Sequence, residues 1–304
     1  MKEKILVTGG SGLLALNWVI AVSNRYSITL GLHTRKILLP NVDVHRFSLE
    51  SVASILAVIE DIQPQVVIHA AGLTNIEECE ANPDLARHIN VELAENVARA
   101  CFQLELPLAH ISTDHLFSGQ LSNVNENQLV APQNVYAKTK AEVEQRVLDI
   151  YPEALVVRTN FYGWGPSYRC SFSDTIIKTL RKGNKITLFD DVFYTPILSE
   201  NLAHAVHELL NRNANGIYHV VGDERISKYQ FGMKVAEHFN LNPKLIEPDS
   251  LTSQTNLVKR PHDMSLSNQK TSDLLKKPLG CVDEHLNRLF DQEKLSLVQQ
   301  VKNL

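Results

Sequence analysis

Two side chains one helical turn apart could together transfer a proton. Tyr136 and Lys140 lie four positions apart, so a helix over this segment would place both on one face. A tyrosine must lose its proton near neutral pH to act as a base, and a neighbouring ammonium favours the phenolate. We therefore expect Lys140 to lower the pKa of Tyr136. Upstream, Thr113 follows a predicted strand and could donate a hydrogen bond to a substrate carbonyl.

A glycine-rich turn near the N-terminus could hold a phosphate group. The segment Gly9–Ala15 has the spacing G-x-x-G-x-x-A, with alanine where many dinucleotide-binding turns have a third glycine. Glycine lets the backbone approach a ligand closely, and a helix N-terminus directs N–H groups at a pyrophosphate. The turn follows a predicted strand and precedes a predicted helix, as such a site requires. The residues predicted to bind the dinucleotide here are Gly9, Ser11, Gly12, Leu13 and Leu14.

These residues lie at the ends of predicted elements that alternate between strand and helix. Strands are predicted at Lys4–Val7, Ile28–Leu32, Val42–Phe47, Val66–Gly72, Leu106–Ser112 and Val156–Val157. Helices are predicted at Leu13–Val22, Leu49–Asp61, Asp84–Leu104 and Val135–Ile150. The alternation predicts an α/β fold with a doubly wound parallel sheet of the Rossmann type.

The regular alternation weakens after residue 160, which predicts a second region. We expect residues 1–160 to form an NAD(P)-binding Rossmann domain. Residues 161–304 are expected to form mainly a smaller C-terminal substrate-binding region. Within it, elements at about 196–226 should pack back on the Rossmann sheet.

Composition and charge exclude several classes of protein. Hydrophobic residues make up 44% of the 304 residues and charged residues 21%, a balance typical of a globular enzyme or binding protein. A net charge of -4 gives no basic surface for nucleic acid, and no apolar run reaches membrane-spanning length. The four cysteines and twelve histidines lack metal-ligand spacing, so no metal is expected. We expect a cytoplasmic protein, and a homodimer is compatible with the sequence.

Four segments together resemble the extended short-chain dehydrogenases/reductases that act on sugar nucleotides. They read TGGSGLLA, VVIHAAG, ISTDHLFSG and NVYAKTK, and the likeness covers nearly the whole chain. Within that class the chain most resembles the dTDP-4-dehydrorhamnose reductase family, which shows S-T-D-Y-V-F-x-G, N-V-Y-G-K-T-K and a later R-P-x-x-x-x-L. Here these motifs lie at Ser112–Gly119, Asn134–Lys140 and Arg260–Leu266.

The resemblance implies a reductase of a nucleotide-linked 4-keto-6-deoxy sugar that uses NAD(P)H. Its catalytic set would be Thr113, Tyr136 and Lys140, with Tyr136 giving a proton to the developing alkoxide. The cofactor would also contact Ala71, Gly72, Thr74, Tyr136 and Lys140. The substrate would contact Thr74, Thr113, Asp114 and Phe161. Three positions depart from the family, because His115 replaces tyrosine, Ala137 replaces glycine and Phe161 replaces a frequent tryptophan. The identity of the nucleotide and sugar therefore stays open.

The end of the second predicted strand bears on the choice of cofactor. NAD-selective Rossmann folds carry an acid there that binds the ribose 2′-hydroxyl, whereas this chain has Arg35 and Lys36. A guanidinium would attract the 2′-phosphate of NADP(H). We therefore predict that Arg35 binds the cofactor and that NADP(H) is favoured, while NAD(H) remains an alternative.

Two other functions share much of this pattern. A sugar-nucleotide epimerase has the same fold and holds its NAD tightly. Dehydratases of this class carry the sequence Thr-Asp-Glu, whereas here Thr113 is followed by Asp114 and His115. The absence of the glutamate counts against dehydration but leaves epimerisation open. The other function is that of a non-catalytic regulatory subunit, since the β subunit of methionine adenosyltransferase also resembles these reductases.

Overall fold

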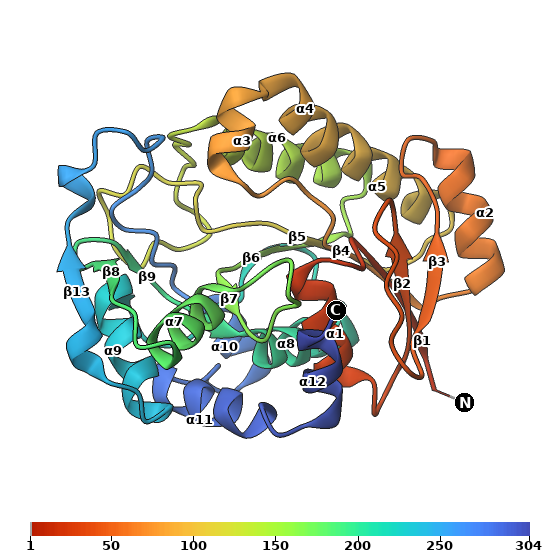
Figure 1. Ribbon diagram of the computed structural model, residues 1–304. Helices are drawn as coiled ribbons and strands as arrows, with labels where there is room; N and C mark the ends of the chain where they lie inside the picture. Colours follow the sequence, from red (N-terminus) through yellow and green to blue (C-terminus); the bar gives the residue numbers. More distant parts are fainter. Residues whose placement is uncertain (1) are drawn as a thin grey trace.

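Seven parallel strands form one continuous sheet at the centre of the molecule (Figure 1). The computed structural model describes residues 2–304. The strands of the sheet are β1 (Lys4–Thr8), β2 (Ser27–Leu32), β3 (Asp43–Arg46), β4 (Val66–His69), β5 (Leu108–Ile111), β6 (Leu155–Arg158) and β11 (Gly216–His219). Their order across the sheet is β11-β6-β5-β4-β1-β2-β3, and every neighbouring pair is parallel. The predicted doubly wound Rossmann sheet is therefore confirmed, with the reversal of strand order between β1 and β4.

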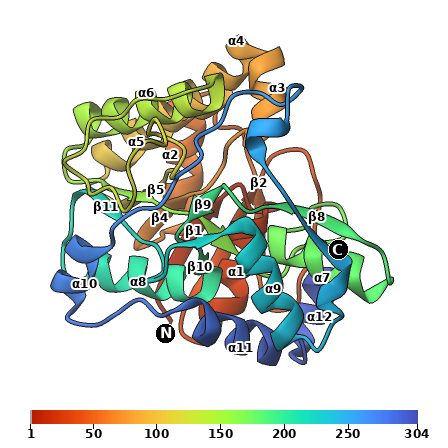
Figure 2. The same cartoon turned by 90° about the vertical axis from the view of Figure 1, so that its left-hand side faces the viewer.

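Helices cover both faces of this sheet (Figures 1 and 2). One face carries α1 (Leu13–Val22), α8 (Ser199–Asn211), α10 (Gln269–Leu275) and α12 (Ser296–Lys302). The other carries α2 (Val52–Ile62), α5 (Leu93–Gln103) and α6 (Val135–Ile150), with α3 (Ile76–Ala81) and α4 (Pro83–Arg87) beside α6. Because both faces are covered, the central strands are almost wholly apolar and buried.

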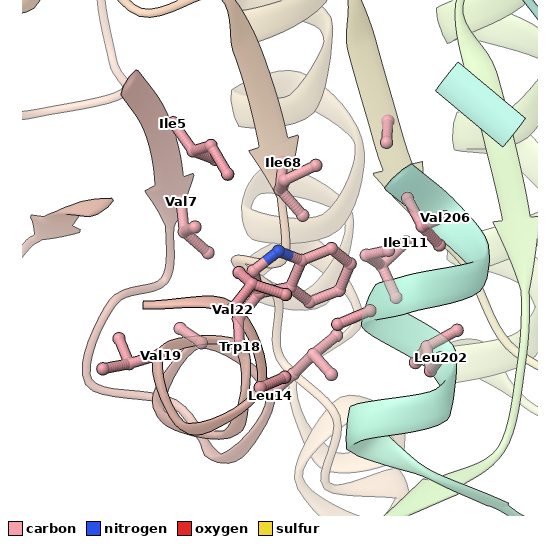
Figure 3. Close-up of a cluster of buried hydrophobic side chains, with 14 of the residues drawn as sticks. Ile5, Val7, Leu14, Trp18, Val19, Val22, Ile68, Ile111, Leu202 and Val206 are labelled. Atoms are coloured by element: carbon pink, nitrogen blue, oxygen red, sulfur yellow. The ribbon is translucent and has the colours of Figure 1, made fainter. Parts of the chain in front are cut away.

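The core under α1 and α8 fixes the helix that follows the glycine turn. Trp18 is fully buried between the two helices and the sheet, facing Leu202 and Val206 of α8 and Ile111 of β5 (Figure 3). Its indole N–H donates to Nε2 of His207, 3.1 Å away. This contact satisfies the polar end of a buried tryptophan and holds α1 firmly against the sheet.

A second core lies beside the sheet, in the C-terminal half of the chain (Figure 1). Its helices are α7 (Phe172–Arg181), α9 (Lys228–His238) and α11 (Val282–Gln292), with short helical turns at η2 (Pro243–Leu245) and η3 (Leu251–Ser253). Its short strands are β7 (Phe161–Tyr162), β8 (Ile186–Phe189), β9 (Phe193–Tyr194), β10 (Ile197–Leu198), β12 (Ile226–Ser227) and β13 (Ile246–Asp249). The division of the chain at residue 160 stays a prediction. None of the helices within residues 2–304 is both long and apolar enough to cross a bilayer.

Candidate active site

A cavity of about 710 Å³ opens at the carboxyl ends of the central strands, where the strand order reverses. It extends from the glycine turn after β1 to the start of α6 and reaches α7 of the second core. The structure brings together, in its lining, the predicted residues Gly9, Ser11, Gly12, Leu13, Leu14, Ala71, Gly72, Thr74, Thr113, Asp114, Tyr136, Lys140 and Phe161. Arg35 is the predicted residue that does not line it.

The glycine turn has the shape that a pyrophosphate needs. Gly9 has φ +69°, and a Cβ there would lie 2.8 Å from the Cα of Ala71, so a side chain would collide with the turn after β4. Gly12 is the N-cap residue of α1, and a Cβ on it would lie 2.9 Å from the carbonyl oxygen of Gly9. No side chain caps α1, and its first turn has no acidic residue. The helix N-terminus therefore presents backbone N–H groups and partial positive charge, and these residues fit a bound dinucleotide.

The environment of Tyr136 differs from the one expected from its sequence neighbours. Burial raises the pKa of Tyr136 to about 12, and the nearby Asp114 carboxylate also raises it. A hydrogen bond with Thr113 and the charge of Arg169 act in the opposite direction. Lys140 is not among the groups that shift this pKa, so the lowering of the Tyr136 pKa by Lys140 stays a prediction. The phenol therefore keeps its proton at neutral pH.

Lys140 is held by groups of the neighbouring strand. Its ammonium donates to the carbonyl oxygen of Ile111 at 2.7 Å and lies 3.3 Å from Nε2 of His110. Burial lowers the pKa of Lys140 to about 8. The His110 ring stacks on His69 at 5.3 Å, and Nδ1 of His69 lies 2.8 Å from the hydroxyl of Thr8. Sequence reasoning missed this buried polar row, which occupies equivalent positions on three adjacent strands.

An ion pair ties α6, which carries both Tyr136 and Lys140, to the sheet. Glu144, one turn after Lys140, accepts three hydrogen bonds of 2.7 to 3.1 Å from Arg158 and one from the Ser112 hydroxyl at 2.5 Å. Both charged side chains are almost fully buried. A buried charge is tolerated only when it is paired and hydrogen-bonded, so this pair strongly constrains where α6 lies.

Asp114 and His115 line the cavity beside the tyrosine. The Asp114 carboxylate accepts from the Asn160 side-chain amide at 2.5 Å and from the Thr113 hydroxyl at 3.4 Å. The His115 ring packs edge-on to the Tyr136 ring with centroids 5.8 Å apart. These contacts hold the Thr113 hydroxyl and the Tyr136 ring at the wall of the cavity.

A π-helical turn interrupts the segment that was expected to be one helix, Asp84–Leu104. The turn, η1 (His88–Glu92), separates α4 from α5 and contains the buried Asn90. The Asn90 side chain accepts from the Leu73 N–H at 2.7 Å and donates to the Leu73 carbonyl and the Thr139 hydroxyl, each at 3.0 Å. These contacts join the loop after β4 to α6 and explain the irregular turn. The sequence analysis did not identify Asn90 as a cavity residue. The signal that could have identified it is a polar residue on the apolar side of the helix predicted at Asp84–Leu104.

Arg35 lies close to the glycine turn without reaching the cavity lining. Its guanidinium stacks over the Tyr168 ring at 3.8 Å, and the Tyr168 hydroxyl donates to the carbonyl oxygen of Ser11 at 2.9 Å. His33, directly after β2, lines the cavity instead. The part of Arg35 in cofactor binding therefore stays a prediction.

The fold and the site define a class of protein. A Rossmann sheet with a glycine turn, and Thr113, Tyr136 and Lys140 in the same cavity, are typical of short-chain dehydrogenases/reductases, which are NAD(P)-dependent oxidoreductases. A model of the RmlD substrate binding domain family matches residues 2–295 of this chain. The chain belongs to that family, and the resemblance expected from its motifs is confirmed.

Known proteins resemble this chain over most of its length. A dTDP-4-dehydrorhamnose reductase of Aggregatibacter actinomycetemcomitans is 25% identical over 278 residues, which are 86% of this chain and 90% of that protein. The crystal structure of dTDP-4-dehydrorhamnose reductase from Bacillus anthracis in complex with NADP has a TM-score of 0.83 and 25% identity, and covers 96% of this chain and 100% of that one. Methionine adenosyltransferase 2 subunit beta of Pongo abelii is 28% identical over 255 residues, 81% of this chain and 75% of that protein.

Proposed function

We propose that this chain reduces a nucleotide-linked 4-keto-6-deoxy sugar with NADPH. The observation that carries the proposal is one continuous cavity with the glycine turn at one end and the Tyr136 and Thr113 hydroxyl groups at the other. A dinucleotide and a second ligand can therefore meet within it. The substrate class is supported by the names of two relatives, both dTDP-4-dehydrorhamnose reductases, and the cofactor by the NADP bound in one of them. We place the reaction in the cytoplasm, as expected from the sequence.

The residues of the chain supply the proton for this reaction. When bound, the cofactor supplies the hydride that reduces the ketone. Tyr136 donates its phenol proton to the alkoxide oxygen that develops, and the Thr113 hydroxyl hydrogen-bonds the same oxygen. Lys140, fixed by Ile111 and His110, places a positive charge beside the reacting groups. Burial raises the pKa of Tyr136 to about 12, so the phenol carries its proton at neutral pH.

The test is turnover of purified protein with NADPH and a set of nucleotide-linked 4-keto-6-deoxy sugars. We expect NADPH absorbance to fall in step with the appearance of an alcohol two hydrogens heavier than the ketone. Product without NADPH consumption would instead support the epimerase. If the protein turns over no keto sugar but binds a methionine adenosyltransferase, the alternative role of a regulatory subunit, which the name of one relative suggests, would be supported.

Arg35→Ala is expected to reduce the preference for NADPH over NADH by about tenfold, the value of one charge-assisted contact to the 2′-phosphate. The proposal is supported by the stacking of the Arg35 guanidinium on Tyr168, whose hydroxyl contacts Ser11 of the glycine turn. The measurement is kcat/KM with each cofactor. Arg25→Ala is the matched control, because Arg25 also lies over a tyrosine ring, that of Tyr26, away from the cavity. If Arg35→Ala kept the wild-type preference for NADPH over NADH, Arg35 would not be a cofactor-binding residue.

A further inference from the structure

Tyr168 lies on the segment between β7 and α7, outside the cavity lining, and contacts two parts of the expected cofactor site. Its hydroxyl donates to the carbonyl oxygen of Ser11, in the glycine turn, at 2.9 Å. The guanidinium of Arg35 lies over its ring, 3.8 Å from the ring centre. Tyr168 therefore connects the glycine turn after β1 to the residues that follow β2.

The segment that carries Tyr168 is anchored to the helix that begins at the glycine turn. The side chain of Asn17, on α1, accepts from the backbone N–H of Trp164 at 3.1 Å and donates to its carbonyl oxygen at 2.8 Å. The carboxylate of Asp174, in the first turn of α7, accepts from the Gly165 N–H at 2.7 Å. All of these groups are buried. Hydrogen bonds between buried groups are costly to break, so the segment holds the Tyr168 ring in one place.

The two partners of Tyr168 use different parts of its side chain. Burial raises the pKa of its hydroxyl, although the charge of Arg35 acts in the opposite direction, and the hydroxyl keeps the proton that it donates to Ser11. The face of the ring is left for Arg35. A guanidinium stacked on a ring keeps the N–H groups at its edge available. Arg35 is exposed, and no carboxylate within residues 2–304 forms an ion pair with it.

Arg35 lies at the point where a Rossmann fold selects its cofactor. It follows Leu32, the last residue of β2, by three positions and Gly12 by twenty-three. At this end of the second strand, the fold places the residue that contacts the 2′ position of the adenosine ribose. A free arginine side chain loses rotamer freedom when it binds a phosphate, and stacking on a ring has already removed part of that freedom. The contact with Tyr168 therefore prepares Arg35 for an anion.

We propose that Tyr168 is a positioning residue for cofactor selection. Its ring holds the Arg35 guanidinium at the place of the 2′-phosphate and so raises the preference for NADPH over NADH. The inference rests on the proposed function, in which Arg35 contacts that phosphate. It assigns part of the cofactor preference to a residue 133 positions beyond Arg35, on the segment that leads into α7.

The experiment is a fluorescence titration of the purified protein with NADPH and with NADH, in the absence of any sugar. The quantity compared is the ratio of the two dissociation constants. We expect Tyr168→Leu to lower the preference for NADPH about two- to fivefold, the value of one exposed cation–π contact. Tyr168→Phe keeps the ring face for Arg35, so its preference should stay within about twofold of the wild-type preference.

Two controls distinguish a positioning role from a structural one. Tyr218→Leu removes another tyrosine ring that carries a cation, the Lys270 ammonium at 3.9 Å, and Tyr218 also lies outside the cavity lining. Its preference should equal that of the wild type. When Arg35 is already alanine, adding Tyr168→Leu should leave the preference unchanged, because the ring then has no guanidinium to hold. A purely structural loss would weaken NADPH and NADH binding equally and would leave the ratio unchanged.

The outcomes separate this inference from the proposed function. A preference in Tyr168→Leu equal to or above that of the wild type would overturn the role of Tyr168, while Arg35→Ala still tests Arg35. If Tyr168→Leu lowered the preference equally with and without Arg35, the ring would not act through Arg35. If Tyr168→Phe lost as much preference as Tyr168→Leu, the ring would not be the group that holds the guanidinium.

Two further results concern the proposed function itself. Equal binding of NADPH and NADH by the wild type would overturn both the cofactor preference and the role of Tyr168. If the preference fell as expected in the variants but the wild type turned over no keto sugar, the role of Tyr168 would be supported and the proposed reduction contradicted.

Discussion

Replacement of Tyr136 by phenylalanine is expected to lower kcat by about a hundred- to ten-thousandfold, the range for losing a general acid. The affinity for NADPH should change little, since the glycine turn lies at the other end of the cavity. The ring of Tyr136 packs against His115, and phenylalanine preserves that contact. Only the hydroxyl that Thr113 hydrogen-bonds is removed. The measurements are steady-state NADPH oxidation and a fluorescence titration of the cofactor.

Tyr162→Phe is the matched control for this experiment. Tyr162 is also a buried tyrosine, but its hydroxyl has no hydrogen-bond partner among residues 2–304 and it does not line the cavity. We expect Tyr162→Phe to keep wild-type kcat. If Tyr136→Phe retained most of the wild-type kcat, the proton would come from another group and Tyr136 would not be the general acid.

The sequence was sufficient to place Tyr136 and Lys140 because the signals for α6 are local. The helix begins after Asn134, whose side chain accepts from the Ala137 N–H at 2.9 Å, an arrangement that asparagine at a helix N-cap predicts. The observed helix, Val135–Ile150, has the predicted bounds. The glycine turn was recognisable for the same reason, since strand, turn and helix are consecutive in the chain.

The features that were not predicted depend on contacts between distant segments. The pKa of Tyr136 is raised because burial removes its hydroxyl from water, and that burial requires packing that no local pattern encodes. The turn that holds Asn90 follows from hydrogen bonds to Leu73 and Thr139. Local patterns therefore located Tyr136 and Lys140 on α6, while tertiary packing determines their burial and the residues around them.

Gly12→Val is expected to weaken NADPH binding about a hundredfold or more, the loss of two charge-assisted hydrogen bonds at about 1.5 kcal/mol each. Gly12 has φ -80° and ψ 161°, which any residue can adopt, so the backbone angles do not forbid the substitution. The obstacle is space, since even a Cβ would lie 2.9 Å from the Gly9 carbonyl oxygen. The branched side chain would also occupy the volume in which a pyrophosphate must approach the N–H groups of α1.

A graded series and a distant glycine distinguish lost binding from lost stability. Gly12→Ala adds the Cβ alone and should weaken NADPH binding less than Gly12→Val does. Gly183 has φ +72°, and a Cβ there would meet nothing within 4 Å, so Gly183→Ala should cost about 1 kcal/mol of unfolding free energy through backbone strain alone. That variant should keep wild-type affinity for NADPH, because Gly183 lies outside the cavity. If Gly12→Val, folded by thermal denaturation, bound NADPH as tightly as the wild type, the pyrophosphate would have to lie elsewhere than on the N-terminus of α1.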